Sequence, residues 1–171
     1  MMDILKTERL NIREFTLLDT KNIYEFSQEE SLKKWLPDQV YADLDEAKET
    51  LEFLISKYRN KEFPLVMAVV KKASNELIGH VGLSEIKQGI EIGYAIGENY
   101  QNKGYASEAV NAYITWAKKE FSLEKIYGVV KCENYGSCRV LEKSQFTYHK
   151  DDNEGEFDRN ALRKIYIWGD K

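Results

Sequence analysis

The residues with the clearest chemical potential form a short loop in the second half of the chain. An apolar segment ends at Ile96, a polar stretch follows, and an amphipathic segment begins directly after Gly104. The free N–H groups and the dipole at a helix start favour an anion, and a glycine lets the backbone approach a phosphate. The spacing is therefore compatible with a phosphate site, but it also fits the simpler alternative that Gly104 only turns the chain and Ser107 only caps the helix.

Composition and motifs argue against several other classes of function. The chain has no GxGxxG after a strand and no GxxxxGK[ST], so neither a Rossmann dinucleotide site nor a P-loop is expected. A formal net charge of −4 argues against nucleic-acid binding, which normally brings a basic excess. Cys132 and Cys138 form no CxxC pair and lie far from His80 and His149, so we expect no metal site. The charged N-terminus and the lack of a long apolar run predict a cytoplasmic protein without a signal peptide or membrane span.

Hydrophobic periodicity predicts an α/β protein in which one domain covers residues 1–171. Closely spaced apolar runs after Pro64 indicate an antiparallel meander within one central mixed sheet. Asp43 should cap one helix, with Glu46 completing a capping box, and residues 151–160 should form a polar loop. The predicted strands are 10–15, 65–70, 77–83, 90–96, 126–130, 145–150 and 162–168, and the predicted helices are 17–28, 44–60, 105–120 and 137–144.

Three segments of the chain resemble the GNAT (Gcn5-related N-acetyltransferase) superfamily. Residues 101–106, Gln-Asn-Lys-Gly-Tyr-Ala, look like its Q/R-x-x-G-x-G/A motif, and residues 134–143 resemble its N-x-x-S-x-R-v-l-e-K segment. Residues 7–13, Thr-Glu-Arg-Leu-Asn-Ile-Arg, are similar to the opening of the branch related to ribosomal-protein N-terminal acetyltransferases, the RimJ/RimL type. One departure is Gln145, which replaces a family glycine that often takes a left-handed conformation at a helix end.

The resemblance implies the GNAT-type acyl-CoA N-acyltransferase fold, a mixed, mostly antiparallel sheet flanked by helices, with acetyl-CoA as co-substrate. In that family the co-substrate enters where two central strands splay apart. Backbone at residues 94–96 would hold the pantetheine arm and the acetyl carbonyl, and the N–H groups of residues 101–106 would bind the pyrophosphate. For Asn134, a turn residue or a helix cap is the alternative. The implied cofactor-binding residues are Tyr94, Ala95, Ile96, Gln101, Asn102, Lys103, Gly104, Tyr105, Ala106, Ser107, Asn134 and Ser137.

The resemblance also suggests which side chains handle protons. Glu91 matches a position that carries a general base in some GNAT enzymes, with a solvent-facing strand charge as the alternative. Ser137 aligns with a serine proposed to protonate the departing thiolate in the RimL-like branch, and Tyr135 is a nearby phenol that could act instead. His80 could border the acceptor site or be an ordinary strand histidine.

The acceptor amine is left open among several classes. We expect transfer to a primary amine, with a protein N-terminal amine favoured by the RimJ/RimL-like opening and with polyamines or antibiotics as alternatives. A non-catalytic domain that only senses acyl-CoA is a further alternative. The acceptor pocket should involve residues 17–60 and the 151–160 loop, with Glu29 among the residues that could attract a cationic amine. A homodimer could form through the closing strands.

Overall fold

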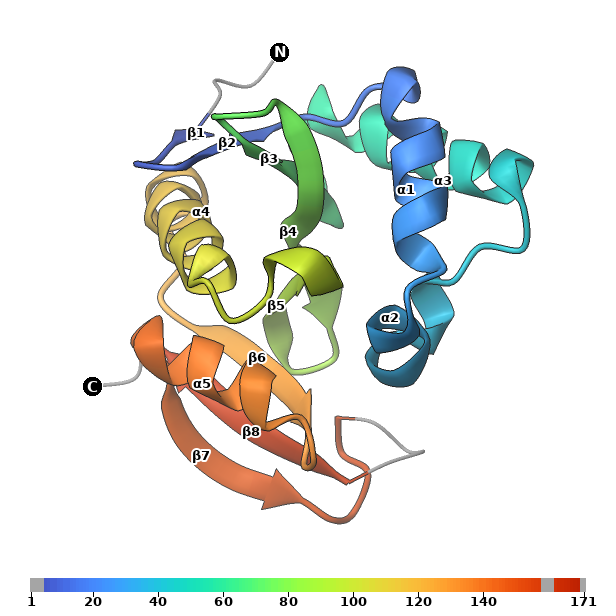
Figure 1. Ribbon diagram of the computed structural model, residues 1–171. Coiled ribbons are helices and arrows are strands. Elements are labelled where there is room, and N and C mark those ends of the chain that lie inside the picture. Colours follow the sequence, from blue (N-terminus) through green and yellow to red (C-terminus); the bar gives the residue numbers. More distant parts are fainter. Residues whose placement is uncertain (1–4, 158–161, 170–171) are drawn as a thin grey trace.

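One eight-stranded sheet runs through the described part of the protein, residues 5–157 and 162–169 of a computed structural model (Figure 1). Neighbouring strands pair antiparallel except β5 and β6, which run parallel. The mixed, mostly antiparallel sheet expected from the sequence is therefore confirmed. In spatial order the strands are β1 (Leu5–Lys6), β2 (Leu10–Arg13), β3 (Leu65–Lys71), β4 (Glu76–Ile86), β5 (Gly89–Ile96), β6 (Ile126–Lys131), β8 (Arg163–Trp168) and β7 (Thr147–Asp152).

Helices cover both faces of this sheet, with α1 and α3 on one face and α4 on the other (Figure 1). The alternation of β3 shows the division, because Met67 and Val69 join the core beneath α4 whereas Ala68 and Val70 join the core beneath α1 and α3. No helix within residues 5–157 and 162–169 is long and apolar enough to cross a bilayer. The helices are α1 (Thr20–Ser27), α2 (Glu30–Trp35), α3 (Leu44–Tyr58), α4 (Tyr105–Phe121) and α5 (Tyr135–Lys143), with 3₁₀ turns η1 (Leu17–Asp19), η2 (Pro37–Gln39) and η3 (Glu98–Tyr100).

Each strand and helix predicted from periodicity is present, with ends that differ by a few residues. The prediction missed β1 and α2, because two and six residues are too short to show a clear period. β7 continues to Asp152, inside the stretch predicted as a loop, and residues 158–160 of that loop lie outside the described residues. β7 is an edge strand, and the homodimer contact expected there stays a prediction.

The start of α3 differs in one detail from the predicted capping box. Asp43 is the N-cap as expected, and its Oδ1 accepts the Glu46 N–H at 2.9 Å. The Glu46 carboxylate bonds the N–H of Ala42 at 2.5 Å, one residue before the N-cap, rather than that of Asp43. The cap is therefore confirmed, and the reciprocal half of the box is shifted by one residue.

The sheet divides between β5 and β6. Strands β4 and β5 pair along their length, from Gly79 with Ile96 to Ile86 with Gly89. Among the described residues, pairing of β5 with β6 is limited to Glu91 and Tyr127. Beyond this pair the two parallel strands part, so residues 92–96 have no strand partner on the β6 side. Their backbone groups on that edge need hydrogen bonds from another source.

Helix α5 ends in a Schellman motif whose left-handed residue is Gln145, with φ of 66°. The Gln145 N–H donates to the Glu142 carbonyl at 3.3 Å, and the Phe146 N–H donates to the Leu141 carbonyl at 3.0 Å. Leu141 and Phe146 both belong to the main core cluster, as this motif usually requires. The chain therefore keeps the helix end expected of a glycine while placing a side chain there, at a cost of about 1–2 kcal/mol.

Replacing Gln145 with glycine should stabilise the folded protein, because glycine takes the left-handed conformation without a Cβ clash. Glycine also loses more conformational freedom on folding, so we expect a net gain of about 0.5–1 kcal/mol and a rise in Tm of roughly 1–4 °C. Thermal unfolding followed by circular dichroism measures this change. Gln145→Ala, which keeps the clash and removes the exposed side chain, is the control, and an equal gain in both variants would contradict the explanation.

Candidate active site

Strand β5 presents different side chains to the two faces of the sheet. Ile92 packs in the core beneath α4, whereas Ala95 packs with Phe26 of α1. Because side chains alternate along a strand, Glu91 shares the face of Ala95, and Tyr94 shares the face of α4. The predicted base, Glu91, and the side chain of Tyr94 therefore lie on opposite faces of one strand.

Tyr94 reaches from β5 to the first turn of α5. Its hydroxyl donates to the Ser137 carbonyl oxygen at 2.9 Å and lies 2.7 Å from Ser137 Oγ. Since the single phenolic hydrogen goes to the carbonyl, the Ser137 hydroxyl is the donor in the second contact. Burial raises the pKa of Tyr94, so the phenol is neutral at neutral pH.

The other predicted acid, Tyr135, lies apart from this contact. Its side chain is 66% exposed, and the Lys164 ammonium lies over its ring, 5.8 Å from the centroid. Of the two predicted acids, Ser137 hydrogen-bonds to β5 through Tyr94, whereas Tyr135 is mostly exposed.

Asn134 is the N-cap of α5. Its Oδ1 accepts the Ser137 N–H at 3.1 Å, which is the helix-cap alternative considered from the sequence. Its contact with a cofactor stays a prediction. Asn134 and Tyr94 together hold Ser137 from two sides, one through the serine N–H and the other through its hydroxyl and carbonyl.

The loop before α4 has the backbone that an anion site requires. Asn102 and Gly104 have positive φ, 59° and 81°, and Gly104 is the N-cap of α4. The first bond of the helix runs from the Glu108 N–H to the Gly104 carbonyl at 3.1 Å, so the N–H groups of residues 105–107 precede the helical ladder. Ser107 is the third residue of the helix, so the alternative that it caps α4 is wrong.

Gln101 braces this loop with its side chain. Its backbone N–H donates to the Glu98 carbonyl at 3.3 Å, and its Nε2 donates to the Ile96 carbonyl at 2.9 Å. The Gln101 N–H is thus already bonded within the protein, so the predicted set of backbone donors for an anion narrows from residues 101–106 to residues 102–106, and their binding of an anion stays a prediction.

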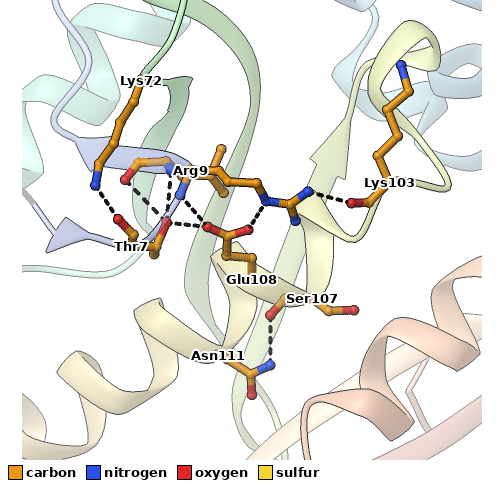
Figure 2. Close-up of polar contacts among 8 residues, drawn as sticks. Thr7, Arg9, Lys72, Lys103, Ser107, Glu108 and Asn111 are labelled. Atoms are coloured by element: carbon orange, nitrogen blue, oxygen red, sulfur yellow. Dashed lines mark hydrogen bonds and ion pairs between the residues drawn. The ribbon is translucent and has the colours of Figure 1, made fainter.

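Arg9, which the sequence did not assign to the site, contacts the same loop. Arg9 donates to the Lys103 carbonyl, and it also pairs with Glu108 in the first turn of α4 (Figure 2). Arg9 belongs to the Thr-Glu-Arg-Leu opening, so a signal was present in the sequence. That motif does not say which residues it contacts.

The face of the sheet that carries Glu91 has room beside it. A Cβ added at Gly93 would meet no heavy atom of the described residues within 4 Å. His80 pairs with Ala95 across β4 and β5, and its ring packs edge-on against Phe26 at 5.9 Å between centroids. Burial lowers the pKa of His80 to about 4, so its imidazole is neutral at neutral pH and fits the strand-histidine alternative.

A cavity of about 180 Å³ opens on the α1 side near the end of β5. Glu25 and Glu29 give it an acidic wall. Burial raises the pKa of Glu29, and the Glu98 N–H donates to Glu29 Oε2 at 2.8 Å. Glu29 is thus also a structural link between the α1–α2 connection and η3. The cavity is lined by Asn22, Glu25, Phe26, Glu29, Leu77, Ile78, Gly97 and Tyr100.

A glycine-capped helix beside a parting pair of parallel strands is the arrangement expected of an acyl-CoA-dependent N-acyltransferase. The family model described as an acetyltransferase (GNAT) domain matches residues 9–147. YnaD of Bacillus subtilis (strain 168), described as an uncharacterized N-acetyltransferase, is 32% identical over 144 residues, which cover 81% of this chain and 79% of YnaD. The chain belongs to the GNAT acetyltransferase family, and it is an acetyl-CoA-dependent N-acetyltransferase.

Two further proteins are similar to this chain. The spermidine N(1)-acetyltransferase of Vibrio cholerae serotype O1 is 26% identical over 141 residues, 81% of this chain and 79% of that protein. The solved structure of RimL, a ribosomal L7/L12 α-N-protein acetyltransferase in complex with coenzyme A, has a TM-score of 0.81 at 16% identity. That comparison covers 98% of this chain and 100% of the RimL chain, and it shows a shared fold. The GNAT-type fold expected from the sequence is confirmed.

Proposed function

We propose that the protein acetylates a primary amine that approaches from the α1–α2 face of β5, with a protein N-terminal amine as the preferred acceptor. The observation that carries this proposal is the division of β5, with Glu91 on one face and the Tyr94–Ser137 contact on the other. An attacking amine loses its proton on the side from which it arrives, and the thiolate gains one on the side from which it leaves. The two kinds of proton-handling group lie on opposite sides of the strand accordingly.

The residues around the parted strands fit an acyl-CoA. The edge of β5 at residues 94–96 offers backbone N–H and C=O groups to a pantetheine arm, and residues 102–107 offer the positive end of α4 to a pyrophosphate. Asn134 would contact the arm from the start of α5. The thioester supplies an electrophilic carbonyl carbon, and an N–H near Ile96 would stabilise the negative charge that develops on its oxygen.

Glu91 is the proposed general base and Ser137 the proposed general acid. The strand surface at Gly93 is open, so an amine or a bridging water has room beside the Glu91 carboxylate. The Ser137 hydroxyl donates to the Tyr94 hydroxyl, and this bond keeps the Ser137 proton on the α4–α5 side of β5. A thiol has a pKa near 8.5, so the acid assists the departure of the thiolate without being essential.

The basicity of amines favours an α-amine acceptor. At pH 7 an α-amine with a pKa near 7.8 is roughly one-eighth neutral, whereas a lysine ε-amine near 10.4 is less than about 0.1% neutral. One carboxylate acting directly or through water is therefore a sufficient base for a protein N-terminus. The RimJ/RimL-like opening at residues 7–13 and the fold shared with RimL support the same acceptor class.

A polyamine is the second candidate acceptor. The acidic wall of the cavity near α1, Glu25 and Glu29, could bind the additional positive charges of such a substrate. The similarity to a spermidine N(1)-acetyltransferase supports this candidate independently of the cavity.

Thiol release from acetyl-CoA, measured with a panel of amines, tests the acceptor. Peptides with free N-termini should give the highest kcat/KM, spermidine a lower value, and the same peptides with blocked N-termini none. A higher kcat/KM for spermidine would establish the second candidate instead. No acceleration by any amine, together with tight CoA binding, would support a non-catalytic acyl-CoA sensor and contradict the proposal.

Ser107→Glu tests the pyrophosphate assignment without weakening the helix. An acidic residue in the first turn favours the α4 dipole, but its carboxylate would occupy the place proposed for the anion. We expect CoA affinity, measured by calorimetric titration, to fall about tenfold or more while Tm is unchanged or higher. Thr115→Glu adds the same charge at an exposed position two turns further along α4 and should leave affinity unaltered. Full CoA affinity in Ser107→Glu would remove this loop from the binding site.

Glu91→Gln and Ser137→Ala separate the two proposed proton transfers. Glu91→Gln should lower kcat roughly 100-fold near neutral pH, and the deficit should shrink as the pH rises because the amine is then already neutral. Ser137→Ala should lower kcat about tenfold with little change in the KM for acetyl-CoA.

Glu85→Gln, an exposed carboxylate on β4, is the matched control and should retain wild-type kcat. A Glu91→Gln deficit that does not vary with pH would exclude Glu91 as the base.

A further inference from the structure

The opening segment of the chain contacts the loop that the proposed function assigns to the pyrophosphate (Figure 2). Arg9 Nη1 donates to the Lys103 carbonyl oxygen at 2.9 Å, and Arg9 Nε donates to Glu108 Oε2 at 2.7 Å. The Arg9 backbone N–H adds a bond to Glu108 Oε1 at 2.9 Å. Arg9, which directly precedes β2, thus contacts the chain on both sides of Gly104, at Lys103 just before it and at Glu108 in the first turn of α4.

Other contacts hold the two partners in place. Thr7 Oγ1 donates to Glu108 Oε1 at 2.5 Å, and the Lys72 ammonium donates to the Thr7 carbonyl. The Arg9 guanidinium lies over the Tyr105 ring, 4.3 Å from its centroid. The Arg9 side chain is still 40% exposed, so its ion pair adds little to folding stability. Its contacts with the loop therefore suggest a role in binding rather than in folding.

The bond from Arg9 sets the orientation of one peptide group in the loop. The Lys103–Gly104 peptide is trans, so its carbonyl and its N–H point in opposite directions. Because Arg9 holds the carbonyl, the Gly104 N–H points away from the guanidinium. Without this bond the peptide could rotate and withdraw its N–H from an anion.

Glu108 is a charge that an anion site at this helix start must neutralise. Burial raises its pKa, but hydrogen bonds from Thr7 and Arg9 outweigh burial and hold the pKa of Glu108 below its usual range. The side chain is therefore a carboxylate at neutral pH, one turn from the N–H groups of residues 105–107. Unpaired, it would repel a pyrophosphate, and the guanidinium of Arg9 removes that repulsion.

Gly104 allows this close contact. A Cβ added there would lie 3.3 Å from Arg9 Nη2, so a larger residue would push the guanidinium away from the loop. The glycine therefore serves both the positive φ of the N-cap and the approach of Arg9.

We infer that Arg9 and Glu108 are a positioning pair that presets the pyrophosphate loop and so makes the enzyme select acyl donors that carry a pyrophosphate over donors that end at pantetheine. This inference rests on the proposed assignment of residues 102–107 to the pyrophosphate. It gives the Thr-Glu-Arg-Leu opening a role in donor selectivity, which the proposed proton transfers do not require.

Steady-state kinetics of Arg9→Ala with two acetyl donors test the inference. With acetyl-CoA, KM should rise about tenfold or more, because the loop no longer has a fixed orientation and binds the donor more weakly. The kcat should change little, because Arg9 does not contact the reacting groups. With S-acetylpantetheine, which lacks the pyrophosphate, kcat/KM should equal that of the wild type. Calorimetric titration with CoA gives the same comparison without turnover. Arg59→Ala, an exposed arginine at the end of α3, is the matched control.

Two further variants test the charge argument. Arg9→Lys keeps the charge but not the forked geometry, so CoA affinity should recover only in part. Arg9→Ala combined with Glu108→Gln should bind CoA more tightly than Arg9→Ala alone, because the unpaired carboxylate is gone. Glu108→Gln alone should have a smaller effect than Arg9→Ala.

The outcomes separate this inference from the proposed function. Equal losses with both donors, or a fall in Tm of the ligand-free protein with unchanged CoA affinity, would reduce Arg9 to a structural residue and overturn the inference. If Ser107→Glu loses CoA affinity and Arg9→Ala does not, the loop assignment stands and the positioning pair fails. If neither variant loses affinity, the loop assignment fails first, and the inference fails with it.

Discussion

In the part of the chain that the structure describes, strands β5 and β6 pair at Glu91 and Tyr127 alone, and the arrangement of the site depends on this short pairing. Strand β5 keeps a full ladder with β4, but from Ile92 onward its other edge has no strand partner among the described residues. Because β5 and β6 are parallel, their carboxyl ends lie at the same edge of the sheet, and α4 and α5 both begin there. The parted strands therefore place unpaired backbone groups beside two helix starts, which suits a long ligand with an amide-containing arm and a phosphate group.

Side-chain contacts between distant segments then fix the details of these two helix starts. Tyr94 secures the first turn of α5 through Ser137, and Arg9 secures the loop before α4 through Lys103. On the other face of β5, Glu29 links the α1–α2 connection to η3, so the acceptor side also touches the segment that leads into the loop. The common effect of these contacts is to hold backbone donors and hydroxyls in defined orientations.

The fold and the proposed acceptor side depend on different kinds of residue. The fold recurs in RimL at 16% identity, because a core accepts many apolar residues if volume and alternation are kept. The α1–α2 face carries the acidic wall of Glu25 and Glu29 and the open strand surface at Gly93. Under the proposed function, this face would select the acceptor amine.

The sequence by itself determined the order of the longer strands and helices and the start of α4 directly after Gly104. It also offered the helix-cap role that Asn134 has in the structure. Each of these features depends on residues within a few positions of one another. The motif at residues 101–106 also located the loop. It wrongly included the Gln101 N–H among the free donors, and the sequence allowed Ser107 as a helix cap, because neither internal hydrogen bonds nor exact helix ends follow from a local motif. Only the tertiary structure decided that Tyr94 meets Ser137, 43 positions away, and that Arg9 meets Lys103, 94 positions away. Such pairings depend on strand order and on which face of a strand each side chain occupies, and no local pattern contains that information.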